Sequence, residues 1–259
     1  MAYTVQDFCN VMEELAPKKL AFEWDNVGLQ VGAPKKQVKV VLVTLTLTHD
    51  VLELAIKRGV DLIICHHPVI FKPLSAIRTD LPQGRLIASL LQYDISVYVS
   101  HTNLDLAAPG LNDWLARDVG IENGKVLVPS TDPDVGLGRY GKIHSTTLGE
   151  LAQQLESLWN SPCRIVGDPS QHVSKVAVVG GSGGDFINQA KRVGADVLIT
   201  GDVSYHDAID AEALGLAVLD AGHFSTEKVM VQEVTQYLRT KFGAEIEVIS
   251  ESSSNPFHF

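Results

Sequence analysis

Residues 55–64 read AIKRGVDLII, and residues 190–199 read AKRVGADVLI. In each segment a helix-like run ends at a glycine, the residue that closes helices most readily, and an apolar run typical of a buried strand follows an Asp. The similarity predicts that two parts of the chain share one plan. Because a helix ended by Gly and followed by a buried strand is a common pattern, a chance match is the alternative explanation.

Further strands and helices flank both segments. The run at 38–47 is rich in β-branched residues and predicts a strand, while the helical spacing of apolar residues over 5–15 predicts an amphipathic helix. Thr147 and Glu150 form a capping signal for a helix over 148–159. The other elements that we expect are strands at 61–65, 95–100, 163–166, 176–179, 197–200 and 217–220, and helices at 50–58, 85–91, 111–119 and 225–241.

This alternation predicts an α/β fold made of two topologically similar α/β domains. We place the first domain at residues 1–125, with its closing strands allowed to come from the C-terminal part of the chain. The second domain is placed at 126–250, and a tail follows at 251–259.

Composition narrows the class of protein. The chain has 259 residues, of which 45% are hydrophobic and 20% charged, as in ordinary soluble globular proteins. The first residues lack the features of a signal peptide and no apolar run is long enough to span a membrane, so we expect a cytoplasmic protein without membrane contact. The net charge of −10, without a basic run, disfavours nucleic acid as a partner.

The cysteine pattern limits the chemistry of any metal site. Cys9, Cys65 and Cys163 lie far apart and form no C-x-x-C pair, so neither a disulfide framework nor a thiolate zinc site is expected. A metal would therefore need imidazole and carboxylate ligands.

Such ligands follow the predicted strands. Parallel α/β sheets place their sites at the carboxyl ends of strands. Five of the nine histidines fall at or just beyond such ends. They are His66, His67, His101, His206 and His223. The other four, His49, His144, His172 and His258, are expected on the surface.

Two carboxylates stand four residues from histidines of this set. Glu227 follows His223, and Asp105 follows His101. This spacing brings side chains to one face of a helix, and a carboxylate such as that of Glu227 can bridge two cations. Mixed imidazole and carboxylate ligation suits Zn, Fe, Mn, Ni or Co and does not select among these metals. His101 is also a candidate for orienting Asp105 or for transferring a proton.

Two features of the sequence have two possible interpretations each. His206 is a candidate catalytic residue that contacts substrate, or a residue that caps the following helix. The glycine-rich run 180–184 follows a predicted strand, so its backbone N–H groups could hold a phosphate, or the run could be a tight strand-to-helix turn.

Several motifs together resemble the NIF-three-like family of dinuclear metal proteins, known as GTP cyclohydrolase I type 2 homologues. The resemblance covers nearly the whole chain. It rests on WDNVGL at 24–29, HHP at 66–68, SHTNLD at 100–105, Gly201-Asp202, and DAGH at 220–223 with Glu227. The chain departs from the family at LTLT, residues 45–48, where many members carry an Asp.

The resemblance implies two similar α/β domains, a ring-shaped homohexamer and two divalent metal ions per subunit. His66, Asp105 and Glu227 would hold one ion. His67, His223 and Glu227 would hold the other, with Glu227 as the bridge.

The implied activity is hydrolysis of a nucleotide or another small molecule, with opening of the guanine imidazole ring of GTP and release of formate as the leading candidate. His101 or His206 would transfer the proton. A metal carrier or insertase, or a scaffold protein without turnover, is the alternative.

Overall fold

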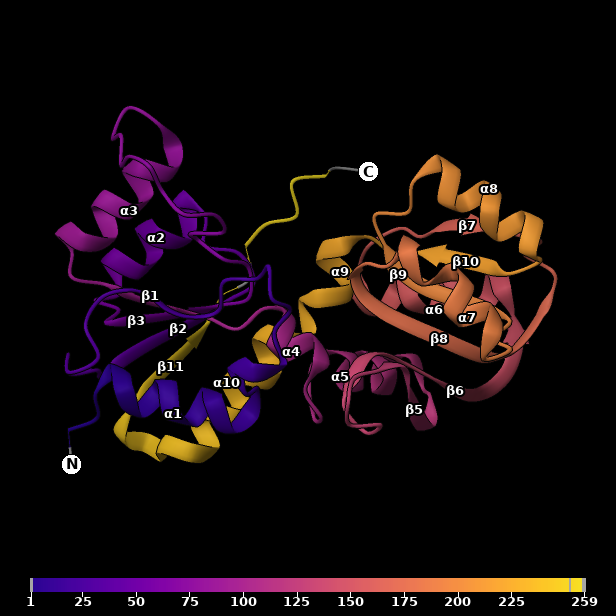
Figure 1. Cartoon of the computed structure of the whole chain (residues 1–259), viewed down its shortest axis with the longest axis horizontal. Helices are drawn as coiled ribbons and strands as arrows, with labels where there is room; N and C mark the ends of the chain where they lie inside the picture. The colour runs from indigo at the N-terminus through magenta and orange to yellow at the C-terminus, as the bar shows by residue number, and fades with distance from the viewer. Residues whose placement is uncertain (1, 252, 258–259) are drawn as a thin grey trace. The chain divides into compact units, whose positions relative to one another are not determined.

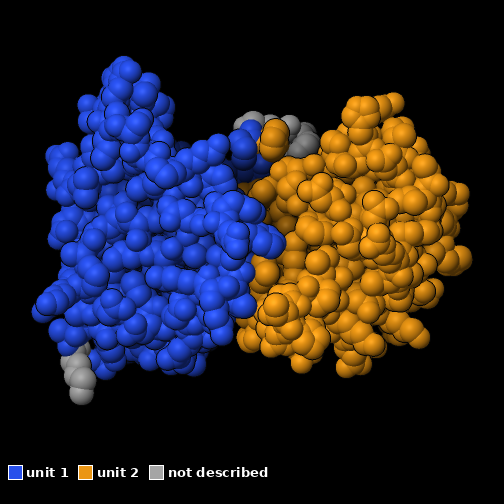
Figure 2. Space-filling view, in the orientation of Figure 1, with its two compact units in different colours: residues 1–104, 230–256 blue, residues 105–229, 257–259 orange. Residues whose placement is uncertain are grey.

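The computed structural model describes residues 2–251 and 253–257. The chain divides into two compact units, the first made of residues 1–104 and 230–256 and the second of residues 105–229 and 257–259 (Figure 2). This division differs from the boundary predicted at 125/126. It differs because helix α5 (Leu111–Val119) packs with strands of the second unit, and because the chain returns to the first unit near its C-terminus.

The first unit contains a five-stranded sheet in the order β1-β4-β3-β2-β11. Strands β2 (Val40–Thr44), β3 (Leu62–Cys65), β4 (Ser96–Val99) and β11 (Glu247–Ser250) run parallel, and β1 (Gly28–Val31) pairs antiparallel with β4. All residues of β3 and β4 are buried, which explains why their sequences are continuous apolar runs.

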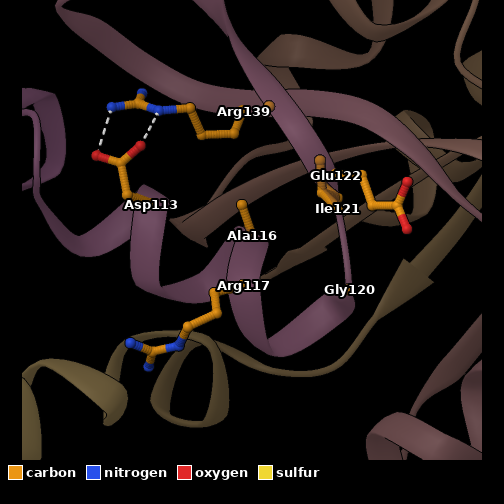
Figure 3. A pocket seen from close by; sticks show the side chains of 8 residues that line it. Asp113, Ala116, Arg117, Gly120, Ile121, Glu122 and Arg139 are labelled. Carbon is orange, nitrogen blue, oxygen red and sulfur yellow. Dashed lines mark hydrogen bonds and ion pairs between the residues drawn. The ribbon is translucent and has the colours of Figure 1, made fainter.

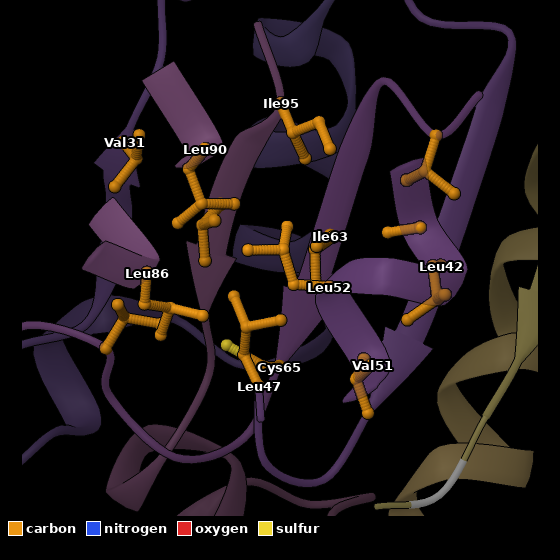
Figure 4. Packing of buried hydrophobic residues seen from close by; sticks show 14 of the residues in the cluster. Val31, Leu42, Leu47, Val51, Leu52, Ile63, Cys65, Leu86, Leu90 and Ile95 are labelled. Atoms are coloured by element: carbon orange, nitrogen blue, oxygen red, sulfur yellow. The ribbon is translucent and has the colours of Figure 1, made fainter. Parts of the chain in front are cut away.

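Helices cover both faces of this sheet. Helices α2 (His49–Lys57) and α3 (Pro82–Gln92) lie on one face, and α1 (Val5–Leu15) and α10 (Val229–Phe242) lie on the other (Figure 1). Figure 4 shows the packing of α2 and α3, in which side chains such as Leu52 and Leu90 contact the sheet. Short 3₁₀ turns lie at Lys18–Leu20 and Gly243–Glu245, and the short helix α4 (Thr102–Leu106) follows β4.

The second unit contains a six-stranded sheet in the order β5-β6-β8-β9-β10-β7. Strands β8 (His172–Ser182), β9 (Val197–Gly201) and β10 (Ala217–Asp220) run parallel, whereas β5 (Glu122–Pro129), β6 (Gly136–Thr147) and β7 (Arg164–Val166) pair antiparallel with their neighbours. The remaining elements are α5, α6 (Leu148–Trp159), a 3₁₀ turn (Gly184–Phe186), α7 (Ile187–Arg192), α8 (Tyr205–Leu214) and α9 (His223–Glu227).

The two sheets share a topological core. In each, an antiparallel edge strand pairs with the last of three parallel strands that run in reverse chain order, namely β1 beside β4-β3-β2 and β7 beside β10-β9-β8. The predicted α/β fold with two similar domains is therefore confirmed. The sheets differ beyond this core, because a parallel strand, β11, joins β2 while an antiparallel strand, β6, joins β8.

The matching segments are alike in atomic detail. Gly59 and Gly194 both have left-handed φ values, +63° and +72°. An Asp follows each of them two residues later. Asp61 Oδ2 accepts hydrogen bonds from the backbone N–H groups of residues 39 and 40, and Asp196 Oδ2 accepts them from residues 174 and 175. Each Asp thus fastens the start of its strand to the start of the neighbouring strand.

One predicted helix is divided into two in the structure, and three strands were not predicted. The helix expected over 225–241 is two helices, α9 and α10, with Lys228 between them. The sequence patterns did not indicate β1, β5 or β11. No helix formed by the described residues is both long enough and apolar enough to span a membrane.

The repeated Asp predicts a matched effect on stability. We expect Asp61→Ala and Asp196→Ala each to lower the free energy of unfolding by about 1–3 kcal/mol, because each leaves two backbone donors without their acceptor. Urea unfolding measures this loss. Asp210→Ala, an exposed position on α8, is the control and should change stability by less than about 0.5 kcal/mol. Equal effects at all three positions would contradict this account.

Candidate metal centre

Three histidines converge at the carboxyl edge of the first sheet. His66 and His67 directly follow β3, and His101 follows its parallel neighbour β4. One ring nitrogen from each lies within 4.8 Å of those of the other two. Because β3 has already ended at Cys65, the two consecutive histidines need not point to opposite faces of a sheet. The convergence expected from the strand ends is thus present within the first unit.

Each ring of this triad is oriented through its Nδ1 atom. His66 Nδ1 lies 2.8 Å from the carbonyl oxygen of Ser100, and His67 Nδ1 lies 2.7 Å from Thr46 Oγ1. A carbonyl oxygen only accepts, so Nδ1 of His66 carries the proton and Nε2 carries the lone pair that a metal would use. Thr46 lies in the segment LTLT, residues 45–48. Its hydroxyl occupies the orienting position for His67.

Asp25 orients the third histidine. Its Oδ1 lies 3.0 Å from His101 Nδ1, and its Oδ2 accepts hydrogen bonds from the backbone N–H and the hydroxyl of Thr102, at 3.1 and 2.6 Å. Burial alone would raise the pKa of Asp25, but the hydrogen bonds from His101 and Thr102 outweigh it and lower the pKa to about 2. The ionised carboxylate of Asp25 orients the ring of His101 through its Nδ1 atom.

The second unit holds an imidazole and a carboxylate side by side. His223 and Glu227 lie one turn apart on α9, with His223 Nε2 3.0 Å from Glu227 Oε2. Asp202, directly after β9, places its Oδ2 2.7 Å from His223 Nδ1. The hydrogen bond to Glu227 raises the pKa of His223 to about 9 against the opposing effect of burial, and Asp202 adds to the shift. Without metal, the positive charge of His223 compensates the buried Glu227 carboxylate.

The glycine-rich run makes room for this pair. A Cβ on Gly181, whose φ is +69°, would lie 2.3 Å from Glu227 Oε1. The backbone N–H groups of Gly180 and Gly181 donate to Asn112 Oδ1 and Thr226 Oγ1, both at 3.0 Å. Residues 180–182 belong to strand β8, so the predicted strand-to-helix turn is confined to Gly183 and the start of the 3₁₀ turn at Gly184, and the N–H groups of Gly180 and Gly181 are used within the chain.

Asp105 and His206, the remaining predicted site residues, belong to neither the triad nor the His223–Glu227 pair in the contacts described above. Asp105 lies in α4, where its carbonyl oxygen accepts a hydrogen bond from Asn112 Nδ2 at 2.9 Å. His206 is exposed in the first turn of α8, with its ring 5.5 Å from that of Tyr205. Ser204 and Asp207 form the cap of that helix, so the capping interpretation of His206 is wrong. His49, His144 and His172 are exposed as expected, and His258 lies outside the described residues.

A pocket in the second unit is built around a structural arginine (Figure 3). The buried Arg139 donates to both carboxylate oxygens of Asp113, at 2.5 and 2.8 Å. Its other N–H groups donate to the carbonyl oxygens of Gly136, Gly138 and Ala107. All five donors of the guanidinium are therefore used to hold α5 against β6, which leaves none for a ligand.

These side chains are of the kinds that hold metal ions in proteins. Histidines oriented through Nδ1 by a carbonyl, a hydroxyl or a carboxylate are common metal ligands, and carboxylates also serve as ligands, so the groups present could hold a metal ion. Sequence reasoning missed Asp25, Thr46 and the role of Gly181. It named Asp25 only inside a motif, because contacts between distant segments leave no local pattern.

We expect Gly181→Ala to weaken metal binding about tenfold or more, because its Cβ would displace the Glu227 carboxylate. Titration calorimetry with Zn²⁺ or Mn²⁺ measures this. Gly215→Ala is the matched control, since Gly215 also has a left-handed φ, +63°, and its Cβ would meet only Lys191 Nζ at 3.7 Å. Both variants should lose similar stability from backbone strain. Equal metal affinities in the two would refute the steric role.

Comparison with known proteins gives the family. The model of the family Duf34/NIF3 (NGG1p interacting factor 3) matches residues 3–256. A protein of Clostridium perfringens named GTP cyclohydrolase 1 type 2 homolog is 37% identical, with 98% of this chain and 99% of that protein covered. A Streptococcus pneumoniae protein of the same name is 39% identical, with 95% and 96% covered.

Solved structures agree with this assignment. A Bacillus cereus protein related to NIF3 has a TM-score of 0.95 and 31% identity, and the match covers 100% of this chain and 99% of that one. Reduced HcgD from Methanocaldococcus jannaschii has a TM-score of 0.82 and 32% identity, with 97% and 98% covered. The chain belongs to the Duf34/NIF3 family.

Proposed function

We propose that this protein is a hydrolase that depends on two divalent metal ions. His66, Asp105 and Glu227 would hold one ion, and His67, His223 and Glu227 the other. The observation that carries the proposal is the triad of His66, His67 and His101, whose ring nitrogens lie within 4.8 Å of one another. The buried Glu227, with His223 beside it, supplies the carboxylate for a bridge.

A pair of divalent ions, once bound, lowers the pKa of a bound water and polarises the centre that is attacked. His101 is the candidate for moving the proton, because Asp25 orients its ring through Nδ1 beside the rings of His66 and His67. His206 is exposed and is the second candidate. The proposed reaction is hydrolytic opening of the guanine imidazole ring of GTP, with release of formate. The names of the curated relatives support this substrate.

The homohexamer and the cytoplasmic location belong to the same proposal. They rest on the family resemblance and on the composition of the chain.

The decisive experiment is formate release from GTP by protein whose metal content has been counted. We expect steady turnover in the wild type and a loss of at least about a hundredfold in Glu227→Gln, which keeps the size of the side chain but removes the bridging charge. Glu53→Gln, an exposed position on α2, is the control and should keep full activity.

Protein with two ions per chain and no formate release would overturn the GTP reaction. Rapid exchange of those ions with a chelator would then favour the metal carrier, and a metal content unaffected by Glu227→Gln would overturn the ligand assignment.

Metal uptake should release a proton from His223. With its pKa raised to about 9, this histidine is protonated at pH 7 in the metal-free protein and must lose the proton to ligate. Calorimetry in buffers of different ionisation enthalpy should show roughly one proton released from this site, absent in His223→Ala. Metal affinity should therefore rise with pH and disappear in acid.

The same pKa shift has the opposite sign for the stability of the metal-free chain. The His223–Glu227 contribution is complete below the unfolded-state pKa of about 6.5 and is lost as pH rises through about 9. Unfolding measured across this range, with Glu227→Gln for comparison, tests the sign.

A further inference from the structure

Three aromatic side chains form an exposed cluster in the first unit, beside the histidine triad. We call Phe22, Trp24 and Phe71 the aromatic shelf. Trp24 stacks on Phe22 with ring centroids 5.5 Å apart and an interplanar angle of 27°, and Phe71 meets Trp24 edge-on at 5.8 Å. The exposed fractions are 59% for Trp24, 43% for Phe71 and 38% for Phe22. Single exposed apolar residues are common on proteins, but three contiguous rings require an explanation.

The shelf adjoins the candidate metal centre directly. The ring of Trp24 meets His101 edge-on, with centroids 6.3 Å apart and an interplanar angle of 72°. His101 in turn lies 5.1 Å from His66 and 5.8 Å from His67. A flat group resting on Trp24 would therefore lie next to the imidazoles that we assign to metal binding and proton transfer.

Hydrogen bonds hold the chain at Phe22 and at one neighbour each of Trp24 and Phe71. The N–H of Phe22 donates to Thr102 Oγ1 at 3.1 Å, and Asp25, next to Trp24, is held by His101 and Thr102. Beside Phe71, the backbone of Ile70 accepts from Asn26 Nδ2 and Gln30 Nε2 and donates to Gln30 Oε1. The rings are thus exposed on a fastened scaffold, an arrangement that lowers the entropic cost of binding.

We propose that the aromatic shelf binds a planar heteroaromatic ring of the substrate, with Trp24 as the stacking surface. This inference rests on the proposed function, and it assigns to a purine base the position beside the triad. Stacking on an aromatic face tolerates different bases, because every base has a π-face, so purines in general and not guanine alone should bind. Trp24 is a substrate-binding residue in this scheme and takes no part in proton transfer.

Tryptophan fluorescence can distinguish Trp24 of the shelf from the other tryptophans of the chain. The chain has three tryptophans, and the exposed fractions of Trp114 and Trp159 are only 8% and 3%, against 59% for Trp24. A ligand that stacks on the shelf should therefore quench the exposed part of the emission.

The test uses the whole 259-residue chain, once with its metal content counted and once after the metal has been removed with a chelator. GMP and AMP should quench the emission, whereas ribose 5-phosphate, which has the same sugar and phosphate without a base, should not. Calorimetry should show GMP affinity reduced about tenfold or more in Trp24→Leu and largely retained in Trp24→Phe, because the first removes the ring and the second keeps one. Tyr93→Leu, an exposed ring after α3, is the control and should bind as the wild type does.

Three results would overturn the inference. They are quenching by ribose 5-phosphate equal to that by GMP, unchanged GMP affinity in Trp24→Leu, and a change of oligomeric state in Trp24→Leu without any base binding, which would identify the shelf as an interface between copies.

Failure of the proposed function is separable from these results. If purines bind the shelf but no formate is released, the inference stands and the GTP reaction falls. If formate is released with an unchanged KM in Trp24→Leu, the reaction stands and the shelf falls.

Discussion

The parallel register of β2, β3 and β4 is the constraint on which the first unit depends. Thr44 pairs with Cys65, and Cys65 pairs with Val99, so the three strands end side by side. The next residues of each strand therefore meet at one edge, where Thr46 contacts His67 and the carbonyl oxygen of Ser100 contacts His66. A shift of one residue in this pairing would reverse the faces of the strands and separate these partners. All four residues of β3 and of β4 are buried, so the strands that place the triad lie in the core of the unit.

The sequence predicted those features that depend on neighbours along the chain. The capping signal at Thr147 and Glu150 marked the start of α6, and the Gly–Asp pattern marked the turns before β3 and β9. The histidines of the triad were found because parallel strands must end at a common edge. Their assignment as ligands, with Asp105, His223 and Glu227, stays a proposal.

The remaining features depend on residues that are distant in the sequence. β1 and β11 are short edge strands, and each is paired with a strand more than sixty residues away, so their four-residue patterns carry no distinct signal. Asp25 is 76 residues from its partner His101, and nothing near it in the sequence shows that it orients a ring. The break at Lys228 falls between two runs that both have helical spacing, so periodicity alone could not divide α9 from α10.

The buried carboxylates near the candidate ligands are compensated differently in the two units. In the first unit the buried carboxylate of Asp25 orients one ring of the triad, that of His101, and its two oxygens are occupied by His101 and Thr102. In the second unit Glu227 is buried beside His223, and a buried carboxylate needs a cation or a proton. The proton on His223 meets that need without metal, and a divalent ion would meet it after displacing the proton. The metal-free state is thereby satisfied as it stands, so metal binding would replace one compensated arrangement with another rather than fill an unstable site.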